Sequence, residues 1–144
     1  MSAVTIRPIS SEAELAAAIA IRRAVFVGEQ GVSEAEEIDG RDGEALHLVA
    51  VESDGEIVGT CRLLADGSKI KLGRVAVLAA ARRRGIALAL LRVGEQHARD
   101  LGGTRIVLGA QIYALGLYEQ AGYRAYGEVF LDAGLEHVLM DKQL

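Results

Sequence analysis

The chain has 144 residues, of which 51% are hydrophobic and 25% are charged, and its formal net charge is −4. These values predict one folded domain, residues 1–144, with a sizeable apolar core, and they exclude a disordered chain. The acidic balance argues against nucleic acid as a partner, no apolar run reaches membrane-spanning length, and the single cysteine excludes a disulfide framework.

The first half of the chain predicts a strand, a helix and then three strands joined by tight turns. Ser11 and Glu14 fit a capping box, which predicts a helix that begins there and continues at helical spacing to Phe26. Residues 28–43 are polar, acidic and punctuated by glycine, which predicts a loop or a short broken helix. Strands are expected at residues 5–8, 47–52, 57–64 and 70–77, with turns at 53–56 and 66–67.

The second half predicts a crossover helix, a strand, a short helix and two closing strands. The expected elements are a helix at about 85–100, a strand at 105–108, a helix at 114–120 and strands at 123–131 and 136–140. The unit from residue 70 to residue 108 requires a parallel, right-handed crossover. The whole order predicts an α/β fold with a mixed sheet, whose ligand site lies where the crossover helix begins.

An anion site is predicted at the start of the crossover helix. Arg82, Arg83 and Arg84 precede Gly85, and small residues then open the helix. A helix N-terminus has unpaired N–H groups and a partial positive charge, and glycine lets a phosphate approach the main chain. In an acidic chain, this basic cluster indicates a local site and not a general affinity for polyanions.

These motifs together resemble the GNAT superfamily of acyl-CoA-dependent N-acetyltransferases, and the resemblance covers nearly the whole chain. Residues 82–87 (RRRGIA) fit the pattern Q/R-x-x-G-x-G/A, and residues 114–123 look like A-x-x-F-Y-x-x-x-G-F/Y with Leu117 in place of the aromatic. Residues 25–30 (VFVGEQ), the segment 39–47 (D-x-x-D, then His47) and residues 132–140 (DAGLEHVLM) are similar to a small branch of that superfamily. The resemblance implies a GNAT-like fold, with a mostly antiparallel mixed sheet flanked by helices.

The resemblance also implies acetyl-CoA as the co-substrate. Its pyrophosphate would lie on backbone N–H groups of residues 82–87, and its pantetheine arm would follow residues 75–77. The Val77 amide would donate to the thioester carbonyl, and Tyr118 would be the general acid for the departing thiolate. The expected cofactor-binding residues are Val75, Ala76, Val77, Arg82, Arg83, Arg84, Gly85, Ile86, Ala87, Gln111 and Tyr118.

The acceptor side is less closely defined by the sequence. Acidic residues near the first helix would attract a cationic amine, and the expected substrate-binding residues are Glu29, Gln30, Asp39 and Asp42. The general base is left open among Glu29, Glu37, Asp39, Asp42 and His47, of which Glu29 and His47 are named with Tyr118 as catalytic. Each of these residues could instead be a solvated loop charge or a histidine that caps a turn.

The predicted function is transfer of an acetyl group from acetyl-CoA to a primary amine of a small acceptor, by direct attack in a ternary complex. The alternative is a non-catalytic acyl-CoA-binding sensor; a nucleotide-binding protein is disfavoured because the chain lacks the Lys-Ser/Thr of a P-loop. The scattered histidines predict no metal site, and the single cysteine and the N-terminus without an apolar core predict a cytoplasmic protein. The oligomeric state is left open between a monomer and a homodimer. Cys61 is expected to be a buried free thiol, and His137 to be structural or at a subunit contact.

Overall fold

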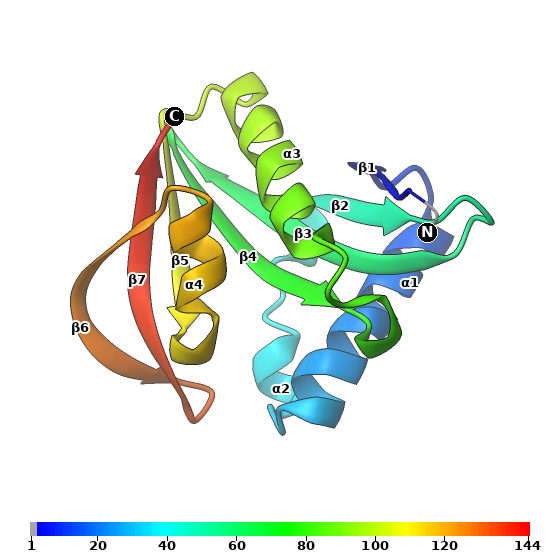
Figure 1. The fold of residues 1–144 in the computed structure, drawn as a ribbon, viewed down its shortest axis with the longest axis horizontal. Helices are drawn as coiled ribbons and strands as arrows, with labels where there is room; N and C mark the ends of the chain where they lie inside the picture. Colours follow the sequence, from blue (N-terminus) through cyan, green and yellow to red (C-terminus); the bar gives the residue numbers. More distant parts are fainter. Residues whose placement is uncertain (1–2) are drawn as a thin grey trace.

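The computed structural model describes residues 3–144 and is built on a seven-stranded mixed sheet with the strand order β1-β2-β3-β4-β5-β7-β6 (Figure 1). The strands are β1 (Thr5–Pro8), β2 (Leu46–Val51), β3 (Ile57–Asp66), β4 (Lys69–Val77), β5 (Arg105–Gln111), β6 (Arg124–Asp132) and β7 (Leu135–Gln143). Neighbouring strands are antiparallel except for β4 and β5, which are parallel. The predicted mostly antiparallel α/β sheet with one parallel crossover is therefore confirmed.

Helices cover both faces of this sheet. They are α1 (Glu12–Arg22), the π-helix η1 (Arg23–Glu29), α2 (Glu34–Glu37), α3 (Ile86–Asp100) and α4 (Leu115–Gln120), with short 3₁₀ turns η2 (Asp42–Glu44), η3 (Ala79–Ala81) and η4 (Ile112–Ala114). Figure 1 shows α3 in front of the central strands and α1 behind them. Among the residues described, no helix is long and apolar enough to cross a membrane.

The helix α1 begins at the predicted cap and changes its winding before the predicted end. The Ser11 Oγ accepts a hydrogen bond from the Glu14 backbone N–H at 3.2 Å. The chain was expected to remain regular to Phe26, but from Arg23 to Glu29 it forms a π-helix, in which the Gln30 N–H bonds the Val25 carbonyl at 3.1 Å. Such wider turns are rare, so helical spacing alone did not reveal this one.

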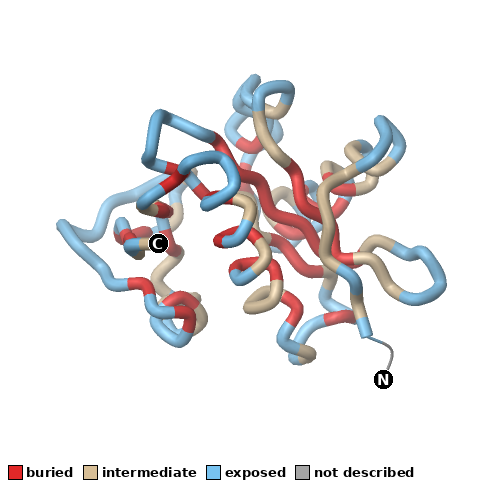
Figure 2. Tube along the Cα trace, turned by 90° about the horizontal axis from the view of Figure 1, so that it is seen from above, coloured by how far each residue is buried: buried red, intermediate tan, exposed pale blue. Residues whose placement is uncertain are grey.

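The apolar core lies on both sides of the central strands. On the α3 side, Leu72 and Leu91 belong to one buried cluster and Leu48 and Leu90 to another. Figure 2 shows buried segments concentrated in the middle of the molecule, with exposed loops around them. Cys61 is a buried free cysteine, as expected, and burial raises the pKa of its thiol to about 12.

A bulge interrupts β4 in its middle. Between the residue pairs that flank it, β3 supplies Cys61 alone, whereas β4 supplies both Arg74 and Val75, and Arg74 has φ 53°. Leu72 and Val77 would face opposite sides of a regular strand, yet both belong to clusters on the α3 side. The extra residue therefore changes which face each later side chain of β4 occupies.

The parallel pairing of β4 with β5 is short. It extends only from the pair Lys69–Arg105 to the pair Lys71–Val107. Beyond it β5 continues to Gln111 alongside β7, three residues past its predicted end, and β4 continues to Val77 alongside β3. The two central strands thus separate toward their carboxyl ends, as Figure 1 shows.

Candidate active site

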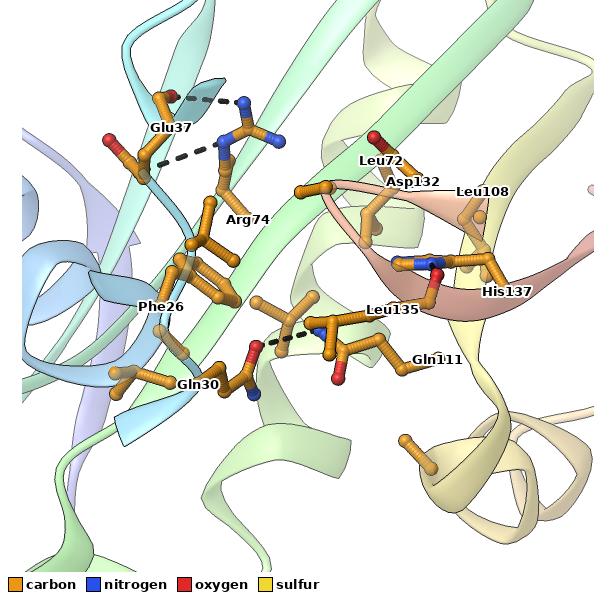
Figure 3. Close-up of a pocket in the computed structure, with 18 of the residues that line it drawn as sticks. Phe26, Gln30, Glu37, Leu72, Arg74, Leu108, Gln111, Asp132, Leu135 and His137 are labelled. Carbon is orange, nitrogen blue, oxygen red and sulfur yellow. Dashed lines mark hydrogen bonds and ion pairs between the residues drawn. The ribbon is translucent and has the colours of Figure 1, made fainter. Parts of the chain in front are cut away.

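The separation of β4 from β5 opens a cavity of about 890 Å³. Its walls come from β4, β5, η1 and α4, and from the β6–β7 hairpin (Figure 3). Of the residues predicted for the site, those that line this cavity are Val75, Ala76, Val77, Arg82, Ala87, Gln111, Tyr118, Glu29, Gln30, Glu37 and Asp39. Segments far apart in the sequence therefore meet at one place.

The loop before α3 is the place where an anion site is predicted. Arg83 has φ 64° and Gly85 has φ 77°, and no side chain caps the first turn of α3. A Cβ added at Gly85 would meet no atom within 4 Å, so the space beside the main chain is open. A helix N-terminus with left-handed residues before it presents successive N–H groups to an anion, so this loop fits a phosphate.

A second cavity, of about 290 Å³, lies at this loop. Val77, Arg82, Ala87 and Leu117 line both cavities. The anion loop and the space between β4 and β5 therefore adjoin each other, which is the geometry that a long ligand with a phosphate group in its middle requires.

The backbone of Val77 faces the space between the two strands. The Leu78 N–H bonds the Val58 carbonyl at 2.9 Å, so it points toward β3. Successive N–H groups along a strand point to opposite edges, so the Val77 N–H points away from β3. The Val77 carbonyl lies on the same edge, where it accepts a hydrogen bond from Arg82 Nε at 2.9 Å.

The arginines of the anion loop differ in their surroundings. Arg82 also forms an ion pair with Glu29 at 2.8 Å, and its hydrogen bond to Glu29 lowers the pKa of that carboxyl. Arg84 forms an ion pair at 2.6 Å with Glu52, which lies in the turn between β2 and β3. Arg84 lines neither cavity. Arg83 lines the smaller cavity.

Tyr118 projects from α4 into the wall of the larger cavity. The side chain is buried, and its ring packs edge-on against Tyr123 with the centroids 6.1 Å apart. Burial raises the pKa of Tyr118 to about 12, so the phenol remains protonated at neutral pH and can donate its proton.

Gln30 and Gln111 are bonded to each other across the cavity. Gln111 Nε2 donates to Gln30 Oε1 at 2.8 Å (Figure 3), and Gln30 Nε2 in turn donates to the Tyr113 hydroxyl at 3.0 Å. This chain of hydrogen bonds ties the end of η1 to the end of β5 across the cavity.

The acidic segment after η1 is neutralised by arginines from other elements. Glu37 is buried and pairs with Arg22 at 2.5 Å, and Arg22 also pairs with Asp42 at 2.7 Å. Burial alone would raise the pKa of Asp42. The hydrogen bonds from Arg22 and Arg62 outweigh this effect, so the pKa lies below its ordinary value. Asp42 lines neither cavity, so its predicted contact with a cationic acceptor has no support in this geometry.

Asp39 lies closer to the cavity and is also paired. Its carboxylate forms a very short ion pair with Arg62 and a longer one with Arg74 at 3.5 Å. The hydrogen bond from Arg62 lowers the pKa of Asp39 well below its ordinary value. The carboxylate therefore has little affinity for a proton, which makes it a poor base.

His47 lies away from the larger cavity. Its ring is buried on β2, and Nε2 lies 2.9 Å from the Asp42 carbonyl oxygen. It lines neither cavity, so the arrangement offers it no access to an acceptor. Among residues 3–144, no group of three or more His, Cys, Asp and Glu side chains is placed to hold a metal ion.

The cavity also has a set of lining residues that sequence reasoning did not assign to the site. They include Phe26, Arg62, Arg74, Phe130 and His137. Phe26 and His137 lie within the VFVGEQ and DAGLEHVLM segments, so those motifs carried the signal. Arg62 and Arg74 carried none, because their partners lie far away in the sequence.

Comparisons with known proteins give a consistent result. The family model of the acetyltransferase (GNAT) domain matches residues 10–144. A Bacillus subtilis relative, the uncharacterized N-acetyltransferase YjcF, is 36% identical over 133 residues, 92% of this chain and 94% of that protein. The crystal structure of an acyl-CoA N-acyltransferase from Pseudomonas aeruginosa matches with a TM-score of 0.84 and 31% sequence identity. A crystal structure from Lactobacillus plantarum, named as an N-acetyltransferase, matches with a TM-score of 0.90 and 33% sequence identity. Each match covers 99% of both chains.

Proposed function

This chain belongs to the GNAT family of acetyltransferases, and we propose that it transfers an acetyl group from acetyl-CoA to the primary amine of a small acceptor. The acceptor attacks directly while both substrates are bound. The observation that carries this proposal is the pair of adjoining cavities, one at the anion loop and one that extends from the Val77 backbone to Tyr118.

Each part of that space suits one part of the donor. The N–H groups at the start of α3, near Gly85, suit the pyrophosphate, and the separated edge of β4 suits the pantetheine arm. When bound, acetyl-CoA supplies an activated thioester. The Val77 N–H would stabilise negative charge that develops on the thioester oxygen, and the Tyr118 hydroxyl would give a proton to the leaving sulfur.

Two of the expected catalytic residues need a different assignment. Glu29 is held by Arg82 and has a lowered pKa, which suits an ion pair that positions the anion loop. His47 lines neither cavity, so we assign it a structural role at the turn that holds Asp42.

A sensor that binds acyl-CoA without catalysis is the second candidate, and the ion pairs of Glu29 and Asp39 favour it because they remove two predicted bases. The part of the larger cavity between η1 and the β6–β7 hairpin favours an enzyme. That part is lined by Phe26, Phe130 and Leu135, and a donor-binding sensor has no need of it.

Calorimetry with acetyl-CoA tests the donor site. Gly85→Glu places a bulky acid at a left-handed residue beside the predicted pyrophosphate, so binding should weaken about tenfold or more, the equivalent of one hydrogen bond to a charged group at ~1.5–3 kcal/mol. Gly55→Glu is the matched control, because Gly55 has φ 92° and equally open surroundings but lies in the β2–β3 turn. Equal binding by both variants would refute the donor site.

Thiol release on an amine panel separates the enzyme from the sensor. The panel contains spermidine, kanamycin, tyramine, lysine and an N-terminal peptide, each with acetyl-CoA and the wild-type protein. We expect CoA release above the amine-free background with at least one of them. Tight acetyl-CoA binding without release on any amine would favour the sensor.

A further inference from the structure

His137 is a buried histidine that lines the cavity and has no role in the mechanism so far. Only 8% of it is exposed, and Figure 3 shows its imidazole projecting from β7 into the cavity. We propose that His137 is the general base, which takes a proton from the acceptor amine at Nε2. This inference deepens the proposed function and depends on it.

One hydrogen bond defines which nitrogen is available. Nδ1 of His137 lies 2.8 Å from the Leu135 carbonyl oxygen. A carbonyl accepts only, so Nδ1 carries the proton in the neutral ring and Nε2 keeps its lone pair. The β6–β7 hairpin therefore holds His137 in the tautomer that a base at Nε2 requires.

The ring is also fixed in position. It stacks on Phe130 with centroids 5.8 Å apart and planes at 28°. His137 is paired with Gln111 across the β5–β7 ladder, at the end of β5 where the cavity begins. Gly109 lies two residues before Gln111 on β5. A Cβ added to Gly109 would lie 3.9 Å from His137 Cδ2, so the glycine leaves the β5 side of the imidazole ring uncrowded.

The carboxylates that line the same cavity are mostly engaged elsewhere. Glu29 pairs with Arg82, Asp39 with Arg62 and Glu37 with Arg22. The other charged side chains that line it come from three elements: Lys71 and Arg74 from β4, Glu36 from α2 and Asp132 from β6. Imidazole is the side chain that accepts and releases a proton near neutral pH, so His137 suits this task better than an ion-paired carboxylate.

The proton balance closes with these residues. The acceptor ammonium gives one proton to Nε2 of His137, and its nitrogen lone pair then forms a bond to the thioester carbonyl carbon. The carbon–sulfur bond breaks, and the sulfur keeps the electron pair and takes a proton from Tyr118. The nitrogen loses its second proton to Tyr118 through solvent, and His137 releases its proton to solvent. One ammonium and one thioester thus give one amide, one thiol and one solvent proton.

The test compares His137→Asn with the wild type and with His97→Gln. The asparagine amide can still donate to the Leu135 carbonyl but has no base at the Nε2 position. His97 lies on α3 and lines neither cavity, so its variant is the control. We expect both variants to bind acetyl-CoA as the wild type does, as measured by calorimetry. For His137→Asn alone, kcat should fall ~10²-fold or more, and the decrease of the rate at acid pH that the wild type shows should be lost. Imidazole added to His137→Ala should restore part of the rate.

A nitrogen-15 spectrum of the histidine-labelled protein tests the tautomer without any acceptor, and it should show a protonated Nδ1 and an unprotonated Nε2 at alkaline pH. The opposite tautomer, a wild-type rate in His137→Asn, or loss of acetyl-CoA binding in that variant would each overturn the role of His137 alone. If the wild type acetylated no amine in the panel, the proposed function and this inference would both be overturned.

Discussion

Replacing Glu37 by glutamine removes one charge from the buried ion-pair network of Arg22, Arg62, Asp39 and Asp42, without changing the size of the side chain. Glu37 and Arg22 are both about 1% exposed at the side chain, and their closest atoms are 2.5 Å apart. Breaking a buried pair costs ~3–5 kcal/mol, because the remaining charge is left without full compensation. Arg22 keeps Asp42 as a second partner, so we expect the lower end, about 3 kcal/mol, which corresponds to a fall in Tm of about 10 °C.

Urea denaturation followed by circular dichroism measures this change. Glu44→Gln is the control, since it removes the partner of Arg41 at 2.6 Å while both side chains are largely exposed, and it should cost less than ~1 kcal/mol. If both variants were equally stable, the network would not contribute as argued. A large change in the apparent KM for the acceptor with unaltered stability would instead restore the original prediction that this acidic segment binds the amine.

Two further predictions concern proton transfer and acid stability. Tyr118→Phe should lower kcat by no more than about 10²-fold, because thiolates leave readily. Because the pKa of Tyr118 is about 12, the wild-type rate should not fall through ionisation of this tyrosine at lower pH. A fall in the wild-type rate near pH 10 that is absent from the variant would contradict this. Hydrogen bonds from Arg7 lower the pKa of Glu14 from 4.5 to about 2 in the folded protein. The ionised Glu14 carboxylate therefore stabilises the fold above pH 4.5, and this stabilisation is lost as the pH falls toward 2. Thermal unfolding should therefore show a smaller loss over this range for Glu14→Gln than for the wild type, and equal losses would refute the assignment.

The sequence was sufficient where structure depends on neighbouring residues. The Ser11 cap and the turn after β3 follow from local hydrogen bonding and backbone preference; the cap occurs where it was expected, and the turn lies at Gly67 and Ser68, one residue later than expected. The loop before α3 was predicted from its arginines and from Gly85 for the same reason, since a helix start is a local feature.

The sequence was insufficient where structure depends on distant residues. Asp39 and Asp42 belong to an acidic segment that predicts an amine-binding surface, but arginines from α1 and β3 neutralise it in the fold. His137 has its hydrogen bond two residues away, yet its position in the cavity depends on how β7 pairs with β5, which no local pattern specifies.

The bulge at Arg74 constrains how this protein can change during evolution. Removing one residue at the bulge would leave Leu72 and Val77 four residues apart, so regular alternation would keep both on the α3 side and Val77 opposite Gly59, but the local bend and twist of the bulge would be lost. Substitutions along β4 change one side chain each, whereas one added residue without a second bulge would turn every side chain beyond it to the other face. The length of β4 is therefore expected to tolerate insertions and deletions less than its composition tolerates substitution.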